Sequence, residues 1–102
     1  MKKVKPIVIR TTNDLADALG LSPADAAEME IRRELNEKII QAVKASGLTH
    51  AEVAKSAQTS RTRLTAILNR DRTHVSTDLM LRILAALGYR AKMSFHRVRP
   101  AA

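Results

Sequence analysis

The residues best suited to chemistry lie near the middle of this chain, and their chemistry is hydrogen bonding. A short helix capped by Ser60 would bury Leu64, Ile67 and Leu68. Its outer face would then carry four polar side chains, Arg61, Thr62, Thr65 and Asn69. Guanidinium, hydroxyl and amide groups of this kind hydrogen-bond to the edges of bases in the major groove of DNA. The pattern therefore predicts a helix that reads bases.

Catalytic patterns are missing from the same sequence. The chain has no cysteine, its three glycines form no phosphate-binding loop, and it contains neither H-E-x-x-H nor a nucleophile elbow. The three histidines, His50, His74 and His96, are too far apart for a recognised metal motif. We therefore expect no enzyme, no cofactor and no small-molecule substrate. The lack of cysteine suits a reducing, cytoplasmic location, and no apolar run is long enough for a membrane span.

A second short helix is predicted just before the base-reading helix. Thr49 and Glu52 fit a capping box, and the small residues Ala54 and Ala57 lie on its inner face. Small residues let two helices cross closely at a steep angle, so that the second helix protrudes. A helix of about 10–12 Å diameter fits a major groove about 12 Å wide. RNA is a weaker alternative because the chain has only Tyr89 and Phe95 for stacking on bases.

Three further helices complete an expected all-α domain over residues 13–88. The first is short, is capped by Thr12 or Asn13, and ends at Gly20. The last begins at Ser76, ends at Gly88, and buries Leu79, Met80, Ile83, Leu84 and Leu87.

The longest predicted helix lies between these two. It starts at Ser22-Pro23, extends about 23 residues to Ser46-Gly47, and is long enough for a bend or break near residues 34–36. Its apolar positions recur every four residues, at Ala27, Ile31, Leu35, Ile39 and Val43.

The chain after residue 88 changes to an alternating pattern that predicts a β-strand over residues 89–96. One face of this strand carries Tyr89, Ala91, Met93 and Phe95. A single strand cannot satisfy its own backbone amides, so it needs a partner. Our first expectation is the same strand of a second copy, which gives a homodimer; the segment Val4–Ile9 and another protein stay open as partners. Residues 1–12 are a basic extension, and residues 97–102 form a tail.

Charge is distributed unevenly along the sequence. Residues 1–12 carry four cations and no acid, and residues 13–37 carry seven acids against two arginines. Residues 38–102 carry twelve Lys or Arg against three acids, and the formal net charge of the chain is +8. A basic C-terminal two thirds favours a polyanionic partner through counterion release. The alternative is a charged surface that is only solvated.

The segment over residues 48–69 resembles the lambda-repressor-like (Xre-type) helix-turn-helix family. Its sequence, LTHAEVAKSAQTSRTRLTAILN, matches the family pattern LTQ-EELA, turn, S-R-S-T-I-S-R-I in spacing and residue class, with the helix-turn-helix at residues 49–69. Nearly the whole range 12–95 is similar to the HigA-type antitoxin branch, on LGLSPADAAEMEIRREL, ASGLTHAEVAKSA and VSTDLMLRILAALGYRAKMSF. Gln58 and Arg70 stand where the family often has Gly. Left-handed backbone at Gln58 would cost about 1 kcal/mol.

The resemblance implies which residues contact DNA. His50 lies at the phosphate-contacting start of the second helix, and Ser60 caps the recognition helix and touches the DNA backbone. The groove-facing positions are Arg61, Thr62, Thr65 and Ala66, of which Arg61 is best suited to bidentate bonding with guanine. The positions nearer the groove walls, where contacts position the protein, are Arg63, Asn69, Arg70 and Arg72. Each arginine taken alone is equally compatible with a solvated surface charge.

The same resemblance implies a five-helix fold and a biological role. The expected protein is a homodimeric repressor of double-stranded operator DNA, the antitoxin of a type II toxin-antitoxin pair. It would repress its own operon and neutralise a RelE-like ribonuclease toxin. The acidic block from Asp14 to Glu37 is either the surface for this basic toxin or a solvated helix face. Alternatives are a stand-alone or prophage regulator of the Xre type, and a protein-binding antitoxin without an operator.

Overall fold

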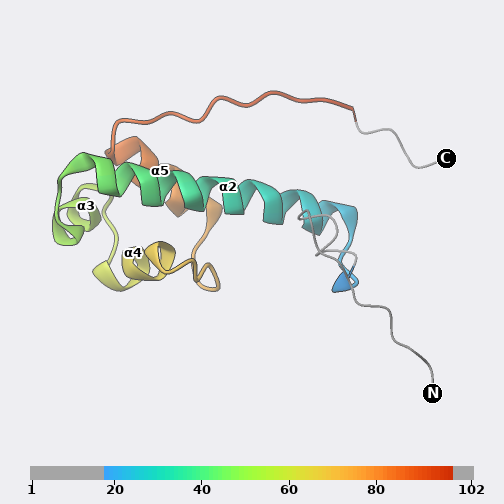
Figure 1. Ribbon diagram of the computed structural model, residues 1–102, viewed down its shortest axis with the longest axis horizontal. Helices are drawn as coiled ribbons and strands as arrows, with labels where there is room; N and C mark the ends of the chain where they lie inside the picture. The colour runs from blue at the N-terminus through green and yellow to red at the C-terminus, as the bar shows by residue number, and fades with distance from the viewer. Residues whose placement is uncertain (1–17, 98–102) are drawn as a thin grey trace, which may run out of the picture.

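The computed structural model describes residues 18–97, which form four helices (Figure 1). These are α2 (Pro23–Ser46), α3 (His50–Ser56), α4 (Arg61–Leu68) and α5 (Thr77–Ala86). The long helix α2 and the short helix α3 each pack against both α4 and α5. The predicted first helix lies outside the described residues except at its end, where Ala18 is helical and Gly20 is left-handed with φ of 72°.

The start of every described helix is fixed by a polar side chain that the sequence predicted. The hydroxyls of Ser22, Thr49, Ser60 and Ser76 each accept a hydrogen bond from the backbone N–H three residues later. The capping boxes of Ser22 with Asp25 and of Thr49 with Glu52 are both complete. A cap of this kind stabilises a helix by about 1 kcal/mol. Short helices such as α3 and α4 depend on such caps because their length alone does not sustain them.

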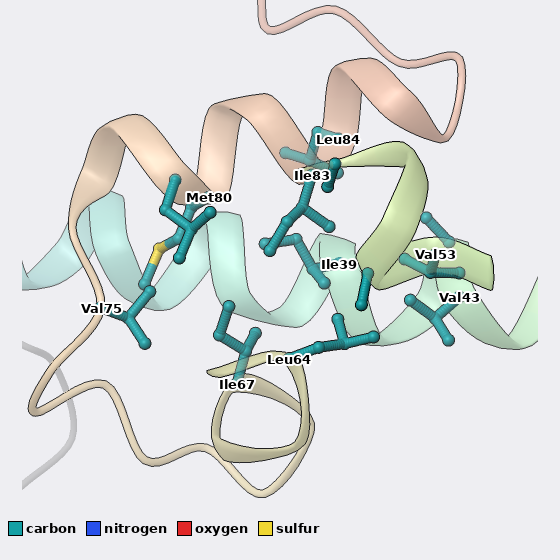
Figure 2. Packing of buried hydrophobic residues seen from close by; sticks show 13 residues of the cluster. Ile39, Val43, Val53, Leu64, Ile67, Val75, Met80, Ile83 and Leu84 are labelled. Carbon is teal, nitrogen blue, oxygen red and sulfur yellow. The ribbon is translucent and has the colours of Figure 1, made fainter. Parts of the chain in front are cut away.

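The hydrophobic core lies where the four helices meet, around the C-terminal half of α2. Figure 2 shows Leu64 and Ile67 directed from α4 toward Ile39 on α2, and Ile83 of α5 in the same cluster. All four side chains are fully buried. The small residues Ala54 and Ala57 of the α3 region are buried in the same cluster. Their small size permits the close helix crossing that the sequence predicted.

The apolar stripe predicted along α2 is buried only in its C-terminal half. Ile39 and Val43 are buried and Leu35 is partly covered, whereas Ile31 is 52% exposed and Ala27 is exposed. Ile31 lines an open groove with Leu81 of α5, and this groove leaves its side chain half exposed. Of the bend or break considered near residues 34–36, the break is absent, because α2 is one continuous helix of 24 residues.

The C-terminal segment, residues 89–97, is extended and runs back along α2 on the side away from α4 (Figure 1). The Tyr89 amide donates to the Leu84 carbonyl at 2.9 Å, but residues 90–97 make no backbone hydrogen bond to another described backbone group. The strand predicted over residues 89–96 is therefore not formed within residues 18–97 of this single chain. A strand exists only where a neighbouring strand pairs with it. Met93 and Phe95 are 72% and 89% exposed.

Candidate nucleic-acid interface

The helix α4 presents to solvent the side chains that the sequence assigned to base contacts. Arg61, Thr62 and Thr65 are exposed, and Ala66 is half-buried beside them. The opposite side of α4 is anchored in the core through Leu64 and Ile67. The predicted inward position of Leu68 is met in part, since this residue is half-buried against the core. The side chains suited to hydrogen bonding therefore lie on a rigid, protruding surface.

A residue other than glycine with left-handed backbone lies on each side of α4. Gln58, in the turn before α4, has φ of 56°, and Arg70, just after α4, has φ of 61°. These are the two positions at which the family that the sequence resembles often has glycine. A residue with a Cβ in this conformation costs roughly 1 kcal/mol relative to glycine. The surrounding bonds fix the geometry: the Thr59 amide donates to the Ala54 carbonyl, and the Arg70 amide donates to the Ile67 carbonyl, each at 2.9 Å.

The loop that follows α4 is held against α2 by Arg32. Its Nη2 donates to the backbone carbonyl of Arg72 at 3.0 Å and to that of Val75. Its Nη1 donates to Thr77 Oγ1 at 3.0 Å, at the start of α5. The Arg32 guanidinium thus donates hydrogen bonds to two loop carbonyls that take no part in helical hydrogen bonding. Arg32 fixes where α5 begins relative to α4.

Asn36 is a fully buried polar residue of α2 and makes a second link to α4. Its Nδ2 donates to the Ile67 carbonyl at 2.9 Å, and its Oδ1 accepts from Arg72 Nη1 at 3.3 Å. The Ile67 carbonyl lies in the last turn of α4 and accepts this bond in addition to the one from the Arg70 amide. Asn36 therefore holds the C-terminal end of α4 in place. Sequence reasoning missed both Asn36 and Arg32. The available signal was that each is a polar residue directly beside the predicted apolar stripe of this helix.

Arg70 forms the one salt bridge found among residues 18–97. Its Nε donates to Glu37 Oε1 at 2.7 Å and its Nη2 donates to Glu37 Oε2 at 3.3 Å. The hydrogen bond from Arg70 lowers the pKa of the Glu37 carboxyl and raises the pKa of the Arg70 guanidinium. In the free protein, Arg70 and Arg72 are thus bonded to α2, through Glu37 and Asn36 respectively. The sequence had placed both arginines at the groove walls.

The other residues of the predicted interface lie at the ends of α3 and α4. His50 is exposed at the first position of α3, next to the cap Thr49. Ser60 and Arg63 are exposed at the start of α4, and Asn69 is exposed at its end. Ser60 performs the capping role predicted for it, because its Oγ accepts from the Arg63 amide at 3.1 Å. Nowhere in the described range do three His, Asp or Glu side chains gather as metal ligands do.

The short helices α3 and α4 are joined by a tight turn that contains the left-handed residue Gln58, and the second helix, α4, is exposed. Two helices arranged in this way are the parts of a DNA-reading unit. A model of a helix-turn-helix domain family matches residues 14–96, which is most of the chain. The chain belongs to this helix-turn-helix domain family. Searches among curated proteins and among solved structures returned no match.

Membership of this helix-turn-helix family has a direct consequence for α3 and α4. In such domains the second helix of the unit enters the major groove while the first crosses the DNA backbone. In this chain α4 is the second helix, and the family supports DNA binding and regulation of transcription. Within residues 18–97, no helix combines the length and apolar character that crossing a bilayer requires.

Proposed function

We propose that this helix-turn-helix protein is a sequence-specific transcriptional repressor that places α4 in the major groove of operator DNA. The observation that carries the proposal is the division of α4 into two sides. Leu64 and Ile67 are fully buried, whereas Arg61, Thr62 and Thr65 face solvent. The outer side therefore offers hydrogen-bond donors and methyl groups of the kinds that contact base edges. The proposal includes no catalysis, and a repressor of this kind acts on DNA in the cytoplasm.

Within this proposal, Arg61 makes the base contact that contributes most to sequence preference. It is the first residue of α4, next to the cap Ser60, and none of its side-chain nitrogens is bonded to a described residue. An arginine at this point has the planar fork needed for the O6 and N7 atoms of guanine. A bidentate contact of this kind contributes about 1–3 kcal/mol to discrimination between bases.

Two substitutions of Arg61 test this assignment on DNA from upstream of the protein's own operon. Arg61→Lys keeps the charge but loses the fork, so we expect affinity for unrelated DNA to persist while preference for the operator falls about tenfold or more. Arg61→Ala removes both, and affinity falls for all sequences. The measurement is a gel shift with operator and scrambled duplexes. Equal operator preference in the wild type and Arg61→Lys would refute the role of Arg61.

We propose that the repressor is a homodimer joined by strands formed from residues 89–96. Two features support this: the backbone of residues 90–97 is unpaired within the described chain, and Met93 and Phe95 are exposed. These residues border an apolar groove of about 850 Å³ whose other wall includes Ile31 and Leu81. Two-fold symmetry would match the symmetry of a pseudo-palindromic operator.

The dimer is tested by sedimentation of two variants at the same position. Met93→Pro removes a ladder donor and is expected to give monomers with much weaker operator binding. Met93→Val keeps the amide and introduces a β-branched side chain that suits a strand, so it is expected to remain dimeric. Identical sedimentation of Met93→Pro and the wild type would exclude residues 89–96 as the dimer contact.

We also propose that the protein is an antitoxin that binds and neutralises a basic toxin, of the RelE-like ribonuclease class. The supporting observation is the acidic N-terminal part of α2, where Asp25, Glu28, Glu30 and Glu34 are all exposed. The gene beside this one is the first object to examine, followed by co-expression of its product. We expect the pair to co-purify and the toxin to be released by Glu28→Lys with Glu30→Lys. A neighbouring product that neither binds nor inhibits growth would leave the stand-alone regulator as the function.

A further inference from the structure

A basic hollow lies between α4 and α5, outside the face of α4 already described. Its volume is about 290 Å³, and its lining includes Arg63 of α4, His74 of the following loop and Arg82 of α5. The caps and turn residues Ser76, Thr59 and Gln58 complete its polar wall. Three elements thus bring basic side chains to one concave surface. Positive side chains that converge on a concave surface attract an anion to it.

The two arginines of this hollow pair with no acidic side chain in the part of the chain described. Neither Arg63 nor Arg82 makes a side-chain hydrogen bond or salt bridge there, in contrast with Arg70. Asp71, the acid nearest to His74 in sequence, accepts hydrogen bonds from the Thr73 hydroxyl at 2.7 Å and amide at 3.1 Å. Ser76 Oγ accepts from the Leu79 amide, so its hydroxyl proton is free for an outside acceptor.

The position of Arg63 on α4 relates this hollow to bound DNA. Successive residues of a helix are about 100° apart, so Arg63 lies about 100° from Thr62, at one edge of the exposed face. A helix that fills the major groove has a phosphate strand along each of its sides. The strand on the Arg63 side would pass over the mouth of the hollow.

We propose that the hollow binds a backbone phosphate of the DNA strand that borders the Arg63 side of α4. Arg63 and Arg82 donate guanidinium hydrogen bonds to its oxygens, and the Ser76 hydroxyl and His74 imidazole donate from the loop. The contact extends the interface beyond the helix-turn-helix segment to α5. It positions the protein and carries no base information. This inference rests on the proposed DNA binding and adds a contact to it.

The test compares Arg82→Gln with Arg33→Gln, which removes the same charge from α2. Arg33 lines the groove beside residues 89–95 and is not part of the lining of the hollow. Affinity is measured for operator and unrelated duplexes over a range of salt concentrations. We expect Arg82→Gln to lose about tenfold affinity for both duplexes and to lower the slope of log K against log salt by about 0.9. We expect Arg33→Gln to keep the wild-type slope.

A neutral methylphosphonate placed at single positions of the operator identifies the phosphate. The wild type is expected to lose affinity at one position on that strand in each half-site, and Arg82→Gln is expected to lose less there than the wild type, because one of the donors to that phosphate is already missing. Thermal unfolding checks that both variants are folded, with Arg63→Gln as a second variant of the same hollow.

Three outcomes separate this inference from the proposed function. Equal salt slopes for Arg82→Gln and Arg33→Gln overturn the phosphate site while leaving DNA binding intact. A loss for Arg82→Gln as large as that of the wild type at the sensitive methylphosphonate position also overturns it, because the two changes would then act independently. A wild-type protein that binds no duplex refutes both proposals.

Discussion

The two long sides of this molecule differ in what they leave exposed. The α4 side shows hydrogen-bonding groups and arginines around a helix whose inner face is fully buried. The opposite side, where residues 89–97 run along α2, shows exposed apolar side chains, among them Ile31, Met93 and Phe95. Lys38 Nζ lies 4.7 Å from the ring centre of Tyr89 and is one contact that joins this segment to α2.

The exposed side chains of the two sides therefore suit two kinds of partner. Polar groups on a rigid helix suit a polyanion with base edges, whereas an apolar groove and an unpaired backbone suit protein. The two sides share α2, which holds α4 through Asn36 and Glu37 and lines the groove through Ile31 and Leu35. Substitutions on the groove side are expected to change operator binding only where they break the dimer, as Met93→Pro does.

The largest effect is expected for Leu64→Ala, compared with Phe95→Ala on the other side. Leu64 is fully buried, and a cavity of this kind costs about 3–5 kcal/mol, a large share of the stability of a small domain. Phe95 is 89% exposed, so its removal should change monomer stability by less than about 0.5 kcal/mol. Urea unfolding at low protein concentration measures both. Equal losses would show that residues 89–97 are buried in solution.

A smaller loss is expected for Asn36→Ala, because it breaks the link between α2 and the end of α4. It leaves the Ile67 carbonyl with one bond fewer and the Arg72 guanidinium without its side-chain acceptor, at a cost of about 1–3 kcal/mol. The control is Gln41→Ala, an exposed residue of the same helix. Hydrogen exchange should show faster opening of α4 in Asn36→Ala. Unchanged protection of α4 would contradict the positioning role of Asn36.

The smallest effect is expected for Glu37→Gln, which releases Arg70. The pKa of Glu37 is lowered in the folded protein, so the pair stabilises the fold at pH above the ordinary value of 4.5 and loses this effect as pH falls through the lowered pKa. Because both groups are exposed, the change in stability is small. A freed Arg70 should raise DNA affinity a few-fold.

The control for this substitution is Glu34→Gln, which removes the same charge one turn earlier. Glu34 lines the same groove as Glu37 but pairs with no described residue. Equal gains in DNA affinity from Glu37→Gln and Glu34→Gln would mean that net charge, and not Arg70, is responsible.

Sequence reasoning predicted the features that depend on neighbours along the chain. The serine and threonine caps, the buried Leu64 and Ile67 and the exposed Arg61 follow from local hydrogen bonds and helical period. The positive φ at Gln58 was anticipated from the position of that residue in the turn. These features define α4 and therefore most of the candidate site.

The features that sequence reasoning missed depend on residues far apart in the chain. Arg32 bonds to residues 40 to 45 positions away, and Asn36 bonds to one that is 31 positions away. Helical period indicates which positions of α2 are apolar, but whether Ile31 is covered depends on what lies across the groove that it lines with α5. Residues 90–97 pair with no described backbone, and local alternation indicates a strand but not its partner.

The most direct test of the central claim is methylation interference on operator DNA. Methyl groups on guanine N7 lie in the major groove, and methyl groups on adenine N3 lie in the minor groove. If α4 enters the major groove with Arg61 on a guanine, guanine methylation at one position of each half-site blocks the wild type, and Arg61→Ala is indifferent to it. Interference confined to adenine N3, or guanine interference unchanged in Arg61→Ala, would contradict this account.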